Sequence, residues 1–445
     1  MKKKRKRGVI LTLKGLHKLE KAKRDTEFEE NNGIQYTWEQ MSDRTGLAVN
    51  TVIKIYAREV GVDRNSLKKC FRAFNLILEP SDYSLRFPQT DEVEKSHTPR
   101  KQEKDIEPEL PVGQVPLDSP FYVEREPIES ECYQTILQPG ALIRIQAPRR
   151  MGKTSLMARI LHKAAEQDYR TVSIDFQLVD REIVQDLDKF LRWFCANVGL
   201  GMQLENQIEE YWDELFGSQV SCKRYFEQYL LAKIDKPIAL ALDDIDRLFV
   251  YPKLASDFFV LLRTWHEEAK NREIWRKLRL VVVHSAEIYI PLSANKSPFN
   301  VGLPIELPPF NREQVQYLAK QQGLDWSVEN AQQLTAFVNG NPCLIRIALY
   351  QIGRGNATLE QVLQTSSLSA GIYGDRLQRE LWNLQQEPEL LAAFVRVVNS
   401  NTPVELDLVE ASKLASMGLV NLQGNLATIS CELYKQYFGD RFSSS

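Results

Sequence analysis

The sequence predicts an α/β fold in which a parallel sheet is covered by helices on both faces, with an all-α domain before it and mainly helical units after it. Short, nearly continuous apolar runs at 141–147, 171–177, 237–244 and 279–286 alternate with longer segments of helical period. Strands of a parallel sheet are buried on both faces, so they are apolar throughout rather than alternating. A short fifth strand is expected within 301–309.

The length and composition predict several domains. At 445 residues the chain exceeds what one hydrophobic core usually supports. Residues 1–87 read as short helices. Residues 88–118 are rich in Pro, Glu and Lys and lack aromatics, so they cannot bury enough apolar area to offset their ordering entropy, and a flexible linker is expected. A folded region follows from 119, and from about residue 312 its pattern is mostly helical.

The charge is unevenly distributed. Residues 1–89 carry 19 Lys/Arg and 11 Asp/Glu, a net charge of +8, against −2 for the whole chain. A basic head on an acidic body indicates that any polyanion binds at the head. There is no apolar stretch of membrane-spanning length and no signal-peptide cleavage site, so no membrane association is expected. The six cysteines are scattered without a Cys-x-x-Cys pair, which fits a cytoplasmic protein without a thiolate zinc site.

A phosphate-binding motif follows the first predicted strand. Residues 147–155, APRRMGKTS, open a helix expected over 153–167. Their pattern is G-x-x-x-x-G-K-[ST], the P-loop, in which backbone N–H groups surround the β-phosphate of a nucleotide at a helix N-terminus. Gly152 allows the backbone to approach the phosphate. Ala147 replaces the first glycine, and because alanine tolerates positive φ poorly, ordinary backbone geometry or some strain is expected there.

Side chains of this motif supply the expected chemistry. Lys153 is predicted to reach the β- and γ-phosphates, and the Thr154 hydroxyl to ligate Mg²⁺. Arg149 and Arg150 either touch phosphate or a neighbouring subunit, or are plain solvated charges. Taken alone, the motif is also compatible with a basic turn before an amphipathic helix. The predicted nucleotide contacts in the motif are Ala147, Pro148, Arg149, Arg150, Met151, Gly152, Lys153, Thr154 and Ser155.

The second half of the predicted site is IALALDDIDRLF (238–249), in which Asp243 ends an apolar strand. A carboxylate there can hold Mg²⁺ directly or through water. Asp244 is predicted to orient or deprotonate the attacking water, and together with Lys153 it is the catalytic candidate. An acidic cluster that only caps a strand is the alternative. Both motifs, in this order and each at the end of its own strand, predict a P-loop core that binds ATP or GTP with Mg²⁺.

Two weaker signals flank these motifs. The strand RLVVVHSA (279–286) ends in Ser285, where a polar side chain would sense the γ-phosphate. A buried core histidine at His284 or a helix N-cap serine is the alternative interpretation. The segment FYVERE (121–126), which includes Arg125, either closes over the base or forms a strand at the sheet edge.

Three segments together, APRRMGKTSL, IALALDDIDR and NGNPCLIRIAL, resemble the AAA-like ATPases common in cyanobacteria and, more broadly, the signal-transduction ATPases with numerous domains (STAND). The resemblance covers about residues 118–440. It implies that Pro342 packs near the adenine and that VERE, with Arg125, precedes the nucleotide fold. The subfamily usually has Glu where this chain has Asp244, one methylene shorter, which bears on the rate of hydrolysis more than on binding.

The resemblance also implies the architecture and the behaviour of the chain. A sheet core (119–310) is followed by a helical lid (311–375) and a winged-helix-like unit (376–445). In that unit a helix ending at Gly418 runs into two strands that turn at Gly424–Asn425. STAND proteins are usually slow switches: ADP holds a closed form, and ATP exchange opens it for self-association.

The basic head contains a helix-turn-helix pattern at 36–58. Helices are expected over 37–45, capped by Thr37, and over 49–58, with Gly46 permitting the turn. The residues expected to pack inward are Trp38, Met41, Leu47, Val52 and Ile55.

The outward face of this head suits a nucleic acid. Asn50, Thr51, Lys54 and Arg58 are of types that contact base edges and phosphates, so DNA binding is predicted there. A third helix over 63–78 adds Arg64, Lys68, Lys69 and Arg72. The pattern is similar to the helix-turn-helix placed at the start of several cyanobacterial STAND-type ATPases. A helical module that docks a protein partner or oligomerises is the alternative.

The leading hypothesis is therefore a slow ATPase switch that couples its nucleotide state to DNA or partner binding through the head. A transcription regulator with a vestigial P-loop is a second hypothesis, which the intact Lys153, Thr154 and Asp243 oppose. A third is a signalling or defence scaffold whose head docks a protein partner, with little ATP turnover.

Overall fold

The computed structural model describes residues 9–12, 15–16, 18–19, 22–23, 26–27, 36, 38–57, 62–79, 82–84, 109–285, 300–364 and 371–442. They belong to two compact units, Met1–Gln102 and Glu103–Ser445. No helix among these residues is both long and apolar enough to cross a membrane.

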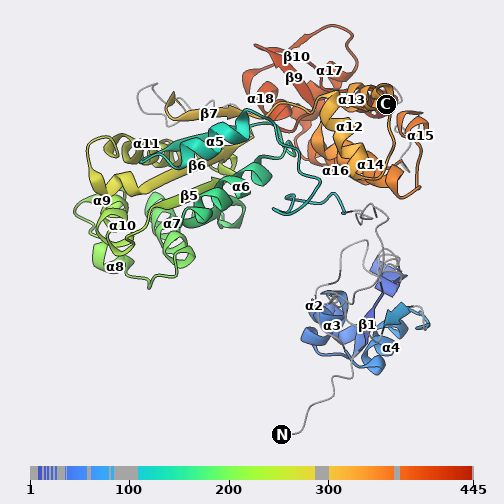
Figure 1. Ribbon diagram of the computed structural model, residues 1–445, viewed down its shortest axis with the longest axis horizontal. Coiled ribbons are helices and arrows are strands. Elements are labelled where there is room, and N and C mark those ends of the chain that lie inside the picture. The colour runs from blue at the N-terminus through green and yellow to red at the C-terminus, as the bar shows by residue number, and fades with distance from the viewer. Residues whose placement is uncertain are drawn as a thin grey trace, which may run out of the picture. The chain divides into compact units, whose positions relative to one another are not determined.

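The larger unit contains a five-stranded parallel sheet (Figure 1). In spatial order its strands are β4 (Arg170–Asp175), β5 (Ile238–Asp243), β6 (Leu278–His284), β3 (Leu142–Gln146) and β7 (Leu303–Glu306). Every residue of β5 and β6 is buried, which explains their continuous apolar runs. The predicted parallel sheet is confirmed. The strand predicted over 171–177 corresponds to β4, which ends at Asp175. The prediction was too long because 176–177 belong to a 3₁₀ turn.

Helices cover both faces of this sheet. They are α5 (Ile128–Ile136), α6 (Lys153–Glu166), α7 (Leu187–Gly201), α8 (Ile208–Tyr211), α9 (Gly217–Tyr225), α10 (Leu231–Lys233) and α11 (Pro252–Glu268). Alternate residues of β5 face opposite ways: Leu240 packs with α7 and α11, whereas Ala241 packs with α5 and α6. The two faces therefore have separate hydrophobic cores.

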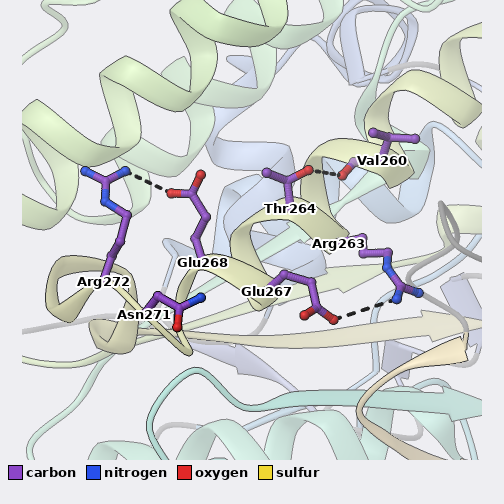
Figure 2. Close-up of a pocket in the computed structure, with 7 residues that line it drawn as sticks. All are labelled: Val260, Arg263, Thr264, Glu267, Glu268, Asn271 and Arg272. Carbon is purple, nitrogen blue, oxygen red and sulfur yellow. Dashed lines mark hydrogen bonds and ion pairs between the residues drawn. The ribbon is translucent and has the colours of Figure 1, made fainter.

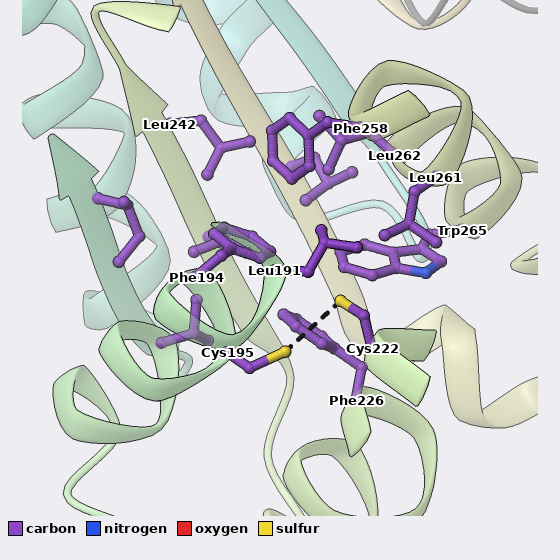
Figure 3. Packing of buried hydrophobic residues seen from close by; sticks show 14 of the residues in the cluster. Leu191, Phe194, Cys195, Cys222, Phe226, Leu242, Phe258, Leu261, Leu262 and Trp265 are labelled. Atoms are coloured by element: carbon purple, nitrogen blue, oxygen red, sulfur yellow. Dashed lines mark hydrogen bonds between the residues drawn. The ribbon is translucent and has the colours of Figure 1, made fainter. Parts of the chain in front are cut away.

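The larger of these cores is rich in aromatic side chains (Figure 3). Phe258 lies at its centre, with ring centroids 5.1 Å from both Phe190 and Phe194. The free thiols of Cys195 and Cys222 are also inside, 3.4 Å apart. Burial raises the pKa of the Cys195 thiol well above its ordinary value, so this thiol is protonated and unreactive in the folded protein.

The C-terminal half is mainly helical and has a core of its own. Its elements are α12 (Arg312–Gln321), α13 (Val328–Val338), α14 (Pro342–Gly353), α15 (Leu359–Gln364), α16 (Gly374–Gln385), α17 (Pro388–Val398), β8 (Val404–Glu405), α18 (Leu408–Ser416), β9 (Val420–Gln423), β10 (Leu426–Ile429) and α19 (Glu432–Phe442). The strands form an antiparallel sheet in the order β8-β10-β9. The predicted hairpin that turns at residues 424–425 is confirmed by the pairing of β9 with β10.

The smaller unit contains the three predicted helices, α2 (Trp38–Thr45), α3 (Val49–Ala57) and α4 (Arg64–Arg72). The third was predicted too long: α4 ends at Arg72, and Asn75 has a φ of +56° that is incompatible with a continuing helix. An antiparallel pair, β1 (Ile10–Leu11) with β2 (Tyr83–Ser84), adds a small ribbon that the all-α prediction lacked. Residues far apart in sequence form this pair, so no local pattern marks it.

The end of the predicted linker is attached to the larger unit. Within 109–118 the chain is irregular, but Val115 N–H donates to Ser155 Oγ (3.0 Å) and Arg159 Nη2 donates to the Pro116 carbonyl (2.7 Å). Packing against α6 therefore begins before residue 119. The following segment, 121–126, is also irregular, so of its two interpretations the strand at the sheet edge was wrong, and closure over the base stays a prediction.

We expect Phe258→Ala to lower the free energy of unfolding by about 3–5 kcal/mol, because it leaves a large cavity among buried rings. Val250→Ala, at a side chain that is 71% exposed, is the control and should change it by less than about 0.5 kcal/mol. Urea unfolding followed by circular dichroism measures both. Equal shifts in the two variants would contradict the central place of Phe258 in this core.

Candidate nucleotide-binding site

The predicted phosphate loop connects β3 to the first turn of α6. Gly152 has a φ of +97°, and a Cβ at this position would lie 3.3 Å from Arg125 Nη2, so glycine suits both the backbone and the space. Arg150 also takes a positive φ, +68°. Ala147 does not, which confirms the expectation of ordinary geometry at the substituted glycine position.

Lys153 and Thr154 begin α6 beside the end of β5. Lys153 is 7% exposed, and its Nζ donates to the carbonyls of Ala147 (2.9 Å) and Pro148 (3.1 Å). The Thr154 hydroxyl donates to Asp243 Oδ2 at 2.9 Å. The structure thus brings together the two motifs, 90 residues apart in sequence, on which the sequence-based prediction depends.

This pair of oxygen ligands fits Mg²⁺. Among the described residues no cluster of three or more acidic, histidine or cysteine side chains could form an all-protein cage for a metal. Mg²⁺ does not need such a cage, since it binds one or two protein oxygens and completes its coordination shell with phosphate oxygens and water. Burial raises the pKa of the Asp243 carboxyl and the nearby Asp244 carboxylate raises it further, against the hydrogen bond that the Thr154 hydroxyl donates. Thr154 and Asp243 are therefore suited to hold the ion.

Burial has the opposite effect on the lysine. Removal from water lowers the pKa of Lys153, against the attraction of nearby carboxylates, of which Asp246 exerts the largest and Asp244 the next. An additional anion would stabilise the charged form of this buried lysine, and a nucleotide phosphate supplies such an anion.

The predicted catalytic carboxylate has a partner in this structure. Asp244 has a φ of +53°, and its side chain accepts a hydrogen bond from the Gln177 amide, next to the end of β4. Its own N–H donates to Asp243 Oδ1 at 3.0 Å. Asp244 lies at the expected strand end, and the Gln177 amide occupies one of its two carboxylate oxygens, Oδ2.

Sequence reasoning missed Asp246. Both of its carboxylate oxygens accept the Ser285 N–H, each at 2.8 Å. Ser285 itself lies where predicted, directly after β6, and it is buried. The Asp-x-x-Asp spacing of Asp243 and Asp246, one turn of chain apart, was the available signal.

The Arg125 side chain contacts the backbone of the phosphate loop. Its Nη2 donates to the Met151 carbonyl at 2.7 Å, its guanidinium lies 4.7 Å from the centroid of the Phe310 ring, and its N–H donates to the buried Glu129 carboxylate at 2.7 Å. This arrangement places Arg125 against the loop backbone.

The C-terminal half also touches the loop. Arg149 N–H donates to the Ser416 carbonyl at 2.9 Å, at the end of α18. The Arg150 guanidinium pairs with the buried Glu380 carboxylate of α16 at 2.9 Å. These contacts join the phosphate loop to the predicted C-terminal unit (376–445).

The remaining predicted residues are placed as follows. Ser155 is buried beside Val115, and Pro342 is buried in the first turn of α14; a role of either in binding the nucleotide stays a prediction. On α3, Lys54 is exposed and Thr51 is half-buried. The side chains of Asn50 and Trp38, and the whole of Thr37 and Arg58, lie outside the described residues.

A separate hollow runs along α11 (Figure 2). It has a volume of about 430 Å³ and is lined by charged side chains that pair with one another, such as Arg272 with Glu268 at 2.9 Å and Arg263 with Glu267 at 3.7 Å. None of the predicted nucleotide-binding residues lines it.

A family model described as an AAA-like domain matches residues 110–440, about three quarters of the chain. An uncharacterised WD repeat-containing protein of Synechocystis is 26% identical over 205 residues, which are 44% of this chain and 17% of that protein. The chain therefore matches only about a sixth of the length of that relative.

Solved structures also resemble this chain. The Walker-type ATPase of Pyrococcus abyssi aligns with 72% of this chain and 96% of its own, at 12% identity and a TM-score of 0.49. The ORC2 protein of Aeropyrum pernix aligns with 73% and 97%, at 14% identity and a TM-score of 0.42. A STAND protein of Pyrococcus horikoshii with a tetratricopeptide repeat sensor aligns with 71% and 42%, at 14% identity and a TM-score of 0.31.

We expect Asp243→Asn to keep or raise the thermal midpoint of the ligand-free protein and to abolish the upward shift given by Mg²⁺ with ATP. The folded-state pKa of Asp243 is raised, so its charge opposes folding at pH 7, and this cost disappears as pH falls through that pKa. Thermal unfolding with and without Mg²⁺ and ATP measures both effects.

Asp186→Asn is the matched control for this experiment. Asp186 is exposed and accepts the Lys189 N–H at 3.0 Å, at the start of α7. Its loss should lower the midpoint slightly while leaving the shift with Mg²⁺ and ATP intact. A full ligand-induced shift in Asp243→Asn would remove Asp243 from the metal site.

Proposed function

The chain belongs to the AAA-like domain family, and from that membership we propose that it is an ATP-operated switch whose N-terminal unit binds DNA or a partner. The family makes the chain an ATPase. The proposal goes further: the nucleotide state changes the contact between the phosphate loop and the C-terminal half, and that change alters what the chain binds.

The observation that supports the switch is the ion pair between Arg150 and Glu380. The Arg150 guanidinium belongs to the loop that is expected to hold the phosphates, yet it pairs with a carboxylate of α16. A γ-phosphate competes with Glu380 for the same guanidinium, since both are anions that arginine binds through paired N–H groups. A diphosphate, which lacks that group, leaves the pair intact. ATP would therefore loosen the C-terminal half, and the exposed surfaces would allow self-association.

Each site residue has a defined part in hydrolysis under this proposal. Lys153 and the loop N–H groups stabilise the negative charge on the transferring phosphate. Thr154 and Asp243 hold Mg²⁺, which when bound would neutralise charge on the phosphate oxygens. Asp244 orients the attacking water through the carboxylate oxygen that Gln177 does not contact.

The contact between Asp244 and Gln177 also favours a second candidate function. The Gln177 amide occupies one carboxylate oxygen of Asp244 and restrains the side chain, which under this second proposal makes Asp244 a weaker water activator and turnover slow or very small. A signalling or defence scaffold that binds ATP, hydrolyses little of it and docks a protein partner through its head agrees with that contact.

DNA binding by the N-terminal unit is supported by the exposed face of α4. Lys68, Lys69 and Arg72 lie on this face, and none of them forms an ion pair with a described residue. The nearest acid on the helix, Asp63, caps it: its carboxylate accepts the N–H groups of Asn65 and Ser66. Exposed cations that pair with no acid among the described residues suit the phosphates of duplex DNA.

We expect Glu380→Gln to release ADP about two- to fivefold faster than the wild type, because a partly exposed ion pair contributes up to about 1 kcal/mol. Stopped-flow displacement of a fluorescent ADP analogue measures the rate. Glu389→Gln, at an exposed residue of α17 outside the loop contact, is the control and should release ADP at the wild-type rate. An unchanged rate in Glu380→Gln would reject this ion pair as the switch.

Lys153→Ala provides the reference for this measurement. Without its ammonium group the phosphates lose their buried cation, so the analogue should bind at least about a hundredfold more weakly. Binding of wild-type strength in this variant would reject the nucleotide site itself.

We expect Lys68→Gln/Lys69→Gln in the full chain to weaken duplex DNA binding equally for all sequences. Each lost phosphate contact should reduce the slope of log affinity against log salt by about 0.9, so the pair reduces it by about 2. Fluorescence anisotropy at several salt concentrations measures the slope. Lys233→Gln/Lys253→Gln, on exposed sites of the larger unit, should leave it unchanged. A wild-type chain that binds no DNA would favour the scaffold.

A further inference from the structure

One peptide group lies between the end of β6 and the phosphate loop. It joins His284 to Ser285. Its carbonyl oxygen accepts the Ala147 N–H at 3.4 Å, and its N–H donates to both carboxylate oxygens of Asp246 at 2.8 Å. Because a peptide group is planar and rigid, a movement of Asp246 is transmitted to the first residue of the loop.

The hydrogen bonds continue from the loop to its lysine. The carbonyl oxygen of Ala147 accepts a hydrogen bond from Lys153 Nζ at 2.9 Å. Lys153 and Ser285 are each only 7% exposed, so water is a poor substitute for these contacts. A carboxylate at one end and an ammonium at the other polarise the intervening groups and strengthen each bond.

The three carboxylates of this segment have different partners. Asp243 accepts the Thr154 hydroxyl, and Asp244 accepts the Gln177 amide. Of the three, Asp246 is the one that contacts the end of β6. The turn that contains it also packs through Ile245 and Leu248, which are completely buried.

The geometry points to Asp246 as a positioning residue for ATP hydrolysis. It acts through the Ser285 peptide, which sets the distance between the end of β6 and the loop around the phosphates. The inference rests on the proposed ATPase switch and deepens it by adding a residue that touches neither phosphate nor metal. Such a residue matters because small displacements of the groups around a reacting phosphate reduce the rate strongly.

Asp246→Asn tests this inference in the full chain. The variant keeps the size of the side chain but replaces one acceptor oxygen with a donor and removes the charge. We expect single-turnover ATP hydrolysis to slow about tenfold to a hundredfold, while the affinity for a fluorescent ADP analogue stays within about twofold. Asp407→Asn is the matched control, because Asp407 accepts a backbone N–H, from Val409 at 2.9 Å, at the start of α18. It should hydrolyse ATP at the wild-type rate.

Asp246→Glu separates position from charge. It keeps the carboxylate and moves it by one methylene, so we expect a rate between those of the wild type and Asp246→Asn. Full wild-type turnover in Asp246→Glu would overturn the inference, since charge alone would then suffice.

The other outcomes are equally decisive. Turnover of Asp246→Asn within about twofold of the wild type would overturn the inference and leave the proposed ATPase switch intact. A parallel loss of ADP affinity and turnover would also overturn it, because that pattern indicates general damage to the site. A wild-type chain that neither binds nor hydrolyses ATP would reject the proposed function itself, and the inference with it.

Discussion

The site depends on the burial of two opposite charges, a lysine and an aspartate. Lys153 lies at the start of a helix and Asp243 at the end of a strand, and each is 7% exposed. Burial lowers the pKa of Lys153 and raises that of Asp243, so it favours the neutral form of each side chain. Charges withdrawn from water are costly unless they are closely paired. A phosphate beside the lysine and a cation beside the aspartate relieve both costs together. The site therefore suits a metal-bound nucleotide, and bound nucleotide is expected to stabilise the folded chain.

The larger unit contains three hydrophobic cores. The sheet has its own cores on its two faces, whereas the C-terminal helices share a third core with Phe121 and Val123. Polar contacts link the phosphate loop to that third body, through Ser416 and Glu380. The proposed switch needs a reversible rearrangement. Apolar packing within each core and polar contacts at the loop agree with it, since polar groups exchange partners with phosphate or water at small cost.

The errors of the sequence-based prediction share a physical cause. The helix predicted over 63–78 was too long. Its apolar residues continue past Arg72, but α4 ends there, and the positive φ of Asn75 does not allow the helix to continue. The ribbon of β1 with β2 was missed because pairing between distant segments leaves no periodic signal. The attachment of 109–118 was missed because hydrogen bonds to Ser155, Arg159 and Arg346 hold that segment, and such bonds between distant residues leave no local pattern.

The sequence by itself determined the order of the strands along the chain, the phosphate loop and the identity of its lysine, threonine and aspartate, because buried parallel strands and glycine-rich turns impose local patterns. Only the tertiary structure decided which carboxylate meets which partner. Asp243, Asp244 and Asp246 are chemically alike and adjacent in sequence, yet they contact Thr154, Gln177 and Ser285 respectively. These partners come from three other segments. Parallel pairing of the strands brings these segments together at the carboxyl ends of the sheet, and no local pattern encodes that convergence.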